Sequence, residues 1–192
     1  MNLKIKDLFK GNFVKLSATR PTDVEEMAKW QEDGDYLRRM DTDFSIPQSV
    51  DTLREHERAR VQGSSSIEFK LRSLEDDRLI GFVALFGIEW NNRAGKLAIG
   101  IGEPNNRGKG YGTDALRLIL RYAFYELNLN RVGLDVISYN HSAIEAYKKV
   151  GFKEEGRMRS AVLRDGQQFD RIMMSILQDE WAEMEKNSTY WR

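Results

Sequence analysis

The sequence contains no cysteine and only two histidines among its 192 residues. Without cysteine, the chain cannot form disulfides, a thiolate nucleophile or a cysteine-ligated zinc or iron–sulfur site. His56 lies in a charged run and His141 in a polar turn, and no further cluster of ligand residues accompanies either one. We therefore expect no metal site.

A long apolar run is also lacking. The longest, at about residues 79–90, is too short to span a bilayer, and residues 1–13 carry scattered charges without the apolar core of a signal peptide. Thirty Lys and Arg residues balance thirty Asp and Glu residues, so no net field attracts nucleic acid or an anionic membrane surface. We expect a cytoplasmic protein with neither of these partners.

The local patterns predict one compact α/β (α+β) domain. Of the residues, 41% are hydrophobic, which is enough for one substantial core. Alternation and short apolar runs indicate strands at residues 13–17, 66–73, 79–86, 96–101, 131–137 and 169–177. Helices are expected from about Pro21 and at residues 50–61, 113–127 and 142–150, with a loop or broken helix at 31–48. This order predicts a mixed, mostly antiparallel sheet with helices on both faces.

A glycine-rich turn precedes the long amphipathic helix. It consists of Arg107, Gly108, Lys109, Gly110, Tyr111, Gly112 and Thr113. Glycines let backbone N–H groups surround phosphate oxygens, the first helical amides lack internal partners, and two cations add positive charge. The turn does not match the P-loop motif, because Arg107 stands where that motif requires a glycine. It does not match the dinucleotide-binding motif G-x-G-x-x-G either, because Thr113 stands where the third glycine belongs. The alternative is a turn that merely joins a strand to a helix.

A second motif follows the next expected strand and reads Asn140-x-x-Ala143-Ile144-x-Ala146-Tyr147-x-x-x-Gly151-Phe152. Together with the turn at 107–112, it resembles the two signatures of the GCN5-related N-acetyltransferase (GNAT) family in their order and separation. The resemblance covers about residues 79–181. Its end is similar to the branch that contains ribosomal-protein N-terminal and spermidine acetyltransferases.

The resemblance implies a single N-acetyltransferase domain over residues 1–192 with the GNAT fold. Its acetyl-CoA-binding core would be 79–181, and residues 1–65, which match loosely, would form a variable acceptor-side region. The family separates its fourth and fifth strands at a bulge. Gly100 and Gly102 are suitable residues for that distortion.

The same resemblance implies that acetyl-CoA is the cosubstrate and that no metal takes part. The backbone amides of residues 107–113 would hold the pyrophosphate. Ile99 and Ile101 would pair with the pantetheine arm, and Asn140 would bond to the same arm.

Acetyl transfer to an amine requires a neutral nucleophile, a polarised carbonyl and a proton for the departing thiolate. The family uses direct attack in a ternary complex, which agrees with the absence of cysteine. Tyr147 is the candidate general acid, and a core aromatic in an apolar helical stripe is the alternative. Ser142 and Glu145 form a capping-box pattern, which would leave Asn140 free for the cofactor.

The sequence specifies the general base poorly. Relatives often carry Glu on the fourth strand, whereas residues 95–100 of this chain contain none. Glu89 and Glu103 are the candidates, and for both the alternative is a solvated residue at a strand end.

We expect the acceptor to be a primary amine, either a small molecule or a protein N-terminus. An acidic stretch in the variable region would attract an ammonium group: Glu32, Asp33, Asp35, Asp41 and Asp43. Arg38 and Arg39 interrupt it, so a solvated loop is the alternative. The alternative function is a catalytically idle acyl-CoA-binding module, which need not keep Tyr147, and a homodimer is left open as the oligomeric state.

Overall fold

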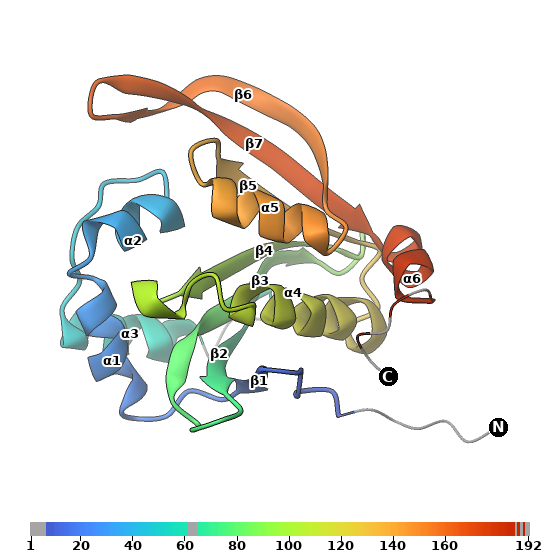
Figure 1. Ribbon diagram of the computed structural model, residues 1–192, viewed down its shortest axis with the longest axis horizontal. Coiled ribbons are helices and arrows are strands. Elements are labelled where there is room, and N and C mark those ends of the chain that lie inside the picture. The colour runs from blue at the N-terminus through green and yellow to red at the C-terminus, as the bar shows by residue number, and fades with distance from the viewer. Residues whose placement is uncertain (1–6, 61–64, 187, 189, 191–192) are drawn as a thin grey trace.

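The computed structural model describes residues 7–60, 65–186, 188 and 190. Its strands form a seven-stranded sheet in the order β1-β2-β3-β4-β5-β7-β6 (Figure 1). The strands are β1 Val14–Ser17, β2 Ile67–Ser73, β3 Leu79–Glu89, β4 Ala94–Ile101, β5 Arg131–Ile137, β6 Lys153–Arg164 and β7 Gln167–Leu177. Neighbouring strands are antiparallel except β4 and β5, which are parallel. The mixed, mostly antiparallel sheet is therefore confirmed.

The α-helices of the described residues are α1 Asp23–Trp30, α2 Gly34–Met40, α3 Val50–Arg60, α4 Tyr111–Arg121, α5 His141–Lys149 and α6 Gln178–Lys186. The predicted helix at 113–127 is wrong in two details. It begins two residues earlier, at Tyr111, and it ends in a π-helical turn, Tyr122–Glu126, which is closed by the bond from Leu127 N to Tyr122 O. Residue 61 of the expected third helix lies outside the described residues.

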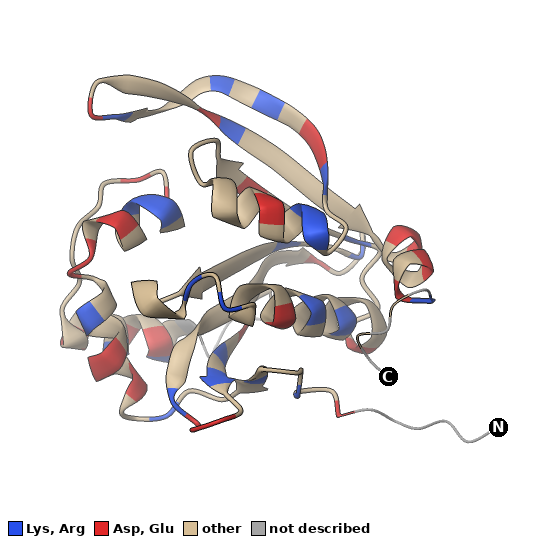
Figure 2. Ribbon diagram, in the orientation of Figure 1, with Lys and Arg blue, Asp and Glu red and all other residues tan. Residues whose placement is uncertain are grey.

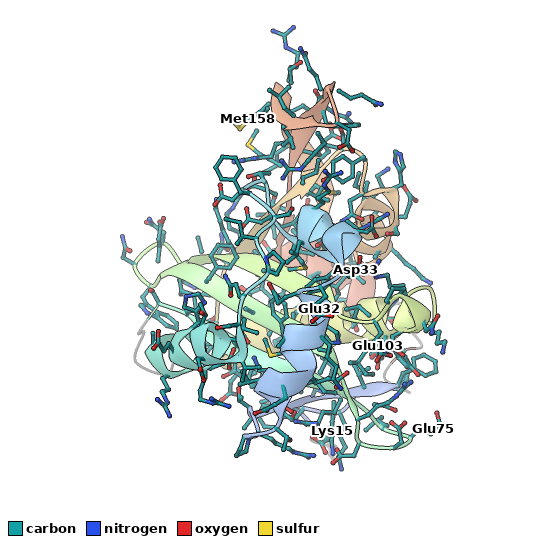
Figure 3. The ribbon with its side chains drawn as sticks, turned by 90° about the vertical axis from the view of Figure 1, so that its left-hand side faces the viewer. Lys15, Glu32, Asp33, Glu75, Glu103 and Met158 are labelled. Atoms are coloured by element: carbon teal, nitrogen blue, oxygen red, sulfur yellow. The ribbon has the colours of Figure 1, made fainter. Side chains whose placement is uncertain are left out.

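Helices cover both faces of the sheet, as the sequence predicts. In Figure 3, α3 and α4 lie on opposite sides of it. The apolar stripe of α4 packs with α5 on one face, in a core that includes Leu71, Val83, Leu97, Leu116, Ile119, Val136 and Ile144. A smaller apolar cluster joins α1, α2 and α3 on the other face and consists of Val24, Met27, Trp30, Tyr36 and Leu53.

Buried ion pairs connect α1 and α3, which carry the smaller apolar cluster, to strand β2 of the sheet. Lys70 of β2 is fully buried and contacts Glu57 of α3 at 2.8 Å as well as Glu68. Arg72 of the same strand lies 2.5 Å from Asp23 at the start of α1. Removal of one partner would leave an uncompensated buried charge, so these pairs strongly constrain where α1 and α3 sit.

The two central strands separate along their length. Pairing between β4 and β5 covers only Ala94–Lys96 of one strand and Arg131–Gly133 of the other. Beyond these residues β4 remains paired with β3 and β5 with β7, so a gap opens in the sheet.

The glycines expected to form a bulge at this gap have another role. Gly100 pairs in regular register with Phe82, and the register shift between β3 and β4 lies between Phe86 and Glu89. A Cβ on Gly100 would lie 3.0 Å from the Met40 sulfur and 3.1 Å from the Tyr36 hydroxyl. A Cβ on Gly102 would overlap the Trp30 ring. Both glycines therefore allow α1 and α2 to pack closely on β4.

Candidate functional site

A cavity of about 710 Å³ occupies the gap between β4 and β5. Its walls come from the glycine-rich turn, the start of α4, α5, α2 and the facing halves of β4 and β5. Ile99 and Ile101, both expected at the cofactor arm, line it from the face that packs on α4. Separation of the two strands thus creates a passage between the faces of the sheet.

The glycine-rich turn has the geometry expected of an anion site. Gly108 and Gly110 have positive φ angles of 75° and 87°, which only glycine adopts readily. Gly110 is the N-cap of α4 and, having no side chain, gives the first helical amides no side-chain hydrogen bond. The turn residues that line the cavity are Arg107, Gly108, Gly110, Gly112 and Thr113, whereas Lys109 and Tyr111 are not part of its wall.

Arg107 also makes contacts that the sequence did not predict. Its guanidinium lies 3.0 Å from Asp35 and 3.5 Å from Asp33, both of α2 or its N-cap, and it donates to the Gly102 carbonyl at 3.4 Å. Arg107 therefore links the turn to α2. Lys109 is exposed and has no ion-pair partner within the described part of the chain.

Asn140 lies at the N-cap of α5 and lines the cavity. The expected capping box is wrong, because Ser142 lies within the first turn of α5, where its hydroxyl donates to Asn140 Oδ1 at 3.2 Å. Arg39 of α2 donates to the same oxygen at 3.4 Å. Asn140 Oδ1 thus accepts from two side chains and caps no helical N–H group, whereas the NH₂ group has no acceptor among the described residues and is available to a ligand in the cavity.

Tyr147 lies on α5 and forms part of the cavity wall. Its side chain is 7% exposed and packs against Phe152 with ring centroids 5.7 Å apart. Burial raises the pKa of the Tyr147 phenol to about 12. It is thus both a core aromatic and a protonated donor beside the cavity.

The opposite face of the gap contains residues that the sequence did not single out. Tyr36 and Met40 of α2, Asp135 of β5 and Arg171 of β7 all line the cavity there. Asp135 contacts Lys96 across the gap at 3.4 Å. A periodicity argument could have placed Asp135, because it alternates with the buried Leu134 and Val136 of its strand and therefore faces away from α4 and α5.

Glu89 and Glu103, the candidate bases, do not line the cavity. Glu89 is exposed at the end of β3 and accepts a hydrogen bond from Asn92, and Glu103 is exposed after β4. Both are therefore better described as solvated residues at strand ends than as catalytic bases. Asp135 is the carboxylate that β5 places in the gap.

Arginines pair with two of the five acids in the acidic stretch, Asp33 and Asp35. Figure 3 shows Glu32 and Asp33 at the junction of α1 and α2, and Figure 2 shows acidic and basic residues together on α2. Asp33 caps α2 by accepting from the N–H groups of Asp35 and Tyr36, and Asp35 also contacts Arg39 at 2.8 Å. Of the five acids, Asp41 alone lines the cavity.

Within the described residues, no group of three or more His, Cys, Asp or Glu side chains is arranged to hold a metal ion. No helix in this part of the chain is long and apolar enough to cross a membrane.

Comparisons with known proteins give the family of the chain. Residues 14–153 match the family model described as "Acetyltransferase (GNAT) domain". The probable N-acetyltransferase YjcK of Bacillus subtilis is 30% identical over 179 residues, which cover 88% of this chain and 97% of the relative. The putative ribosomal N-acetyltransferase YdaF of the same organism is 33% identical over 139 residues, covering 70% and 74% of the two chains.

A solved structure is also similar. The spermidine N-acetyltransferase from Vibrio cholerae, in complex with CoA and spermine, superimposes with a TM-score of 0.79 at 25% identity, covering 88% of this chain and 98% of that one. The chain therefore belongs to the GNAT acetyltransferase family. This confirms the family, the fold and the enzyme class predicted from the sequence.

Proposed function

We propose that this protein transfers an acetyl group from acetyl-CoA to a primary amine by direct attack in a ternary complex. The observation that carries the proposal is a single cavity lined from both faces of the sheet. The glycine-rich turn, Asn140 and Tyr147 line it on one side, and Met40, Asp135 and Arg171 line it on the other. A donor and an acceptor bound from opposite faces would meet between β4 and β5, and their proximity would supply much of the catalysis.

The residues present fit acetyl-CoA. The positive φ angles of Gly108 and Gly110 and the uncapped start of α4 form a cradle of N–H groups for a pyrophosphate. The edge of β4 beyond Lys96 has no strand partner on the β5 side, so Ile99 and Ile101 offer backbone groups to an extended arm. Bound acetyl-CoA supplies an activated thioester.

In the proposed reaction the bound ammonium group first loses one proton and becomes a neutral amine. The amine nitrogen then bonds to the acetyl carbon, the carbon–sulfur bond breaks, and the second proton that the nitrogen loses is taken up by the departing thiolate. Tyr147 remains protonated because its pKa is raised to about 12. Full proton transfer to a thiolate with a thiol pKa of ~8.5 is uphill, so Tyr147 acts mainly by donating a hydrogen bond to the leaving sulfur. Asp135 holds the incoming ammonium group and receives the first of these two protons.

Calorimetry with acetyl-CoA tests the cofactor assignment. Gly110→Asp adds a side chain and a negative charge at the cradle, and we expect it to weaken acetyl-CoA binding by at least about 10-fold. Gly166→Asp is the matched control, because Gly166 also has a positive φ of 73° and open space around it but lies in the β6–β7 turn. If the two folded variants bind acetyl-CoA with equal affinity, the glycine-rich turn does not bind the pyrophosphate. Amine-dependent turnover of acetyl-CoA by the wild type would exclude the alternative function, a catalytically idle acyl-CoA-binding module.

A further inference from the structure

Two opposite charges lie in diagonal positions on β5 and β7, on the face of the sheet away from α4 and α5, which we call the acceptor face. Asp135 and Ile137 of β5 face the same side of the sheet, and Ile137 pairs directly with Arg171 of β7. Asp135 and Arg171 both line the cavity. Asp135 Oδ2 accepts from Lys96 at 3.4 Å, which leaves Oδ1 without a partner among the described residues, and Arg171 Nη2 donates to Thr42 Oγ1 at 2.7 Å. The pair therefore presents an anion and a cation to the same ligand.

Arg171 retains donors beyond its bond to Thr42. A guanidinium carries five N–H donors in a planar fork. Arg171 Nε is buried and has no hydrogen-bond partner within the described residues. An unsatisfied buried donor is costly, and a carbonyl or carboxylate oxygen is the group that best satisfies this fork.

We propose that the acceptor is an α-amino group next to a carbonyl or carboxylate, as at a peptide N-terminus or in a free amino acid. This inference rests on the proposed acetyltransferase function. The ammonium group lies at Asp135 before it loses its proton, and Arg171 holds the neighbouring oxygen. Arg171 thus acts as a specificity-determining residue.

The charges around the site disfavour a linear polyamine. A polyamine carries a second ammonium group along its chain, which would meet the Arg171 guanidinium. The acids at the start of α2 do not compensate for this cation, because arginines already hold them. Asp33 lies 3.5 Å from Arg107, and Asp35 contacts both Arg107 and Arg39. A polyamine would therefore find a cation beside the carboxylate of β5. The one acid of the stretch that lines the cavity, Asp41 at the C-cap of α2, already accepts hydrogen bonds from the N–H groups of Thr42 and Asp43.

The wild-type enzyme is tested first with a matched panel of acceptors and acetyl-CoA, by measuring acceptor-dependent thiol release. The probes are a tetra-alanine peptide, L-alanine, spermidine and n-propylamine. We expect kcat/KM for the better α-amino probe to exceed that for spermidine and n-propylamine by at least about 10-fold, because one charge-assisted hydrogen bond has this order of magnitude. The peptide and the amino acid distinguish a carbonyl from a carboxylate as the group that Arg171 holds.

Arg171→Gln then tests the specificity role. It should lower kcat/KM for the α-amino probes by about 10- to 100-fold, leave n-propylamine within about 2-fold, and raise kcat/KM for spermidine. Arg171→Lys keeps the charge without the fork and should recover only part of the loss. Arg157→Gln, a change to an exposed arginine of β6 that does not line the cavity, is the control and should change none of these values.

Different results overturn different statements. If spermidine is the preferred acceptor, or if Arg171→Gln lowers all acceptors equally in a folded protein that binds acetyl-CoA normally, the α-amino inference is wrong and the acetyltransferase function stands. If no amine supports thiol release, the proposed function fails and the inference fails with it.

Discussion

Arg107 of the glycine-rich turn and Asp35 of α2 lie 3.0 Å apart. Asp35 also contacts Arg39 at 2.8 Å, and Arg39 donates to Asn140 at 3.4 Å. A chain of polar contacts thus runs from the glycine-rich turn over α2 to the N-cap of α5. The wall of the acceptor side is therefore connected to two residues expected to bind the cofactor.

The Arg107–Asp35 pair gives the first prediction. Both side chains are partly exposed, so the pair contributes only about 0–1 kcal/mol, and a bound phosphate can compete with it. Asp35→Asn removes a negative charge beside the cradle and should tighten acetyl-CoA binding by roughly 2- to 5-fold, whereas Arg107→Ala should weaken it by roughly 10-fold. Calorimetry at low salt measures both.

Asp43→Asn is the matched control, because it neutralises an acid of the same segment that does not line the cavity. It should leave the dissociation constant unchanged. If Asp35→Asn instead binds acetyl-CoA more weakly, then Asp35 holds Arg107 in the position that binds the phosphate and does not compete with the phosphate for Arg107.

The second prediction concerns the Tyr147 hydroxyl. Tyr147→Phe keeps the packing against Phe152 but removes the donor, so kcat should fall by roughly 10- to 1,000-fold while acetyl-CoA affinity stays within about 2-fold. Tyr122→Phe provides the control, since Tyr122 is a partly buried tyrosine that packs against Phe69 away from the cavity. Steady-state kinetics and calorimetry separate the two effects. Full activity in Tyr147→Phe would show that the hydroxyl takes no part in catalysis and that Tyr147 is only a core aromatic.

The third prediction uses the raised pKa of Tyr147. The pKa is about 12 in the folded protein and ~10 for an exposed tyrosine, so the folded state holds this proton more tightly than the unfolded chain does. The stability that this contributes is fully present below pH ~10 and is lost as the pH rises through about 12. The melting temperature of the wild type should therefore fall more steeply above pH ~10 than that of Tyr147→Phe. If the melting temperatures of the two proteins change with pH in parallel, the pKa of Tyr147 is not raised.

The local elements around the site could be predicted from the sequence because their signals are local. The alternation of residues 131–137 gives β5 with the same bounds, and the apolar spacing of α4 gives its buried face. Gly108 and Gly110 mark a turn that needs positive φ angles, and this requirement can be recognised without knowledge of the surroundings.

Errors occur where a neighbouring residue competes for the same role. Ser142 fits the start of a capping box, yet α5 begins at His141 and Asn140 occupies the N-cap. Gly100 and Gly102 suggest a bulge, whereas they make room for side chains of α1 and α2. A glycine in a strand signals that something approaches closely, but the sequence does not say which element approaches.

The sequence by itself determined the family and the glycine-rich turn, and it predicted the cofactor role of that turn and the role of Tyr147, because each depends on residue types at short, fixed spacings. Only the tertiary structure decided which charges meet. The pairing of Arg107 with Asp35, the place of Asp135 in the gap and the position of Arg171 beside it depend on strands and helices that are distant along the chain. Electrostatic and hydrogen-bonding energies fall steeply with distance, so the roles of these residues follow from the path of the chain and not from local pattern.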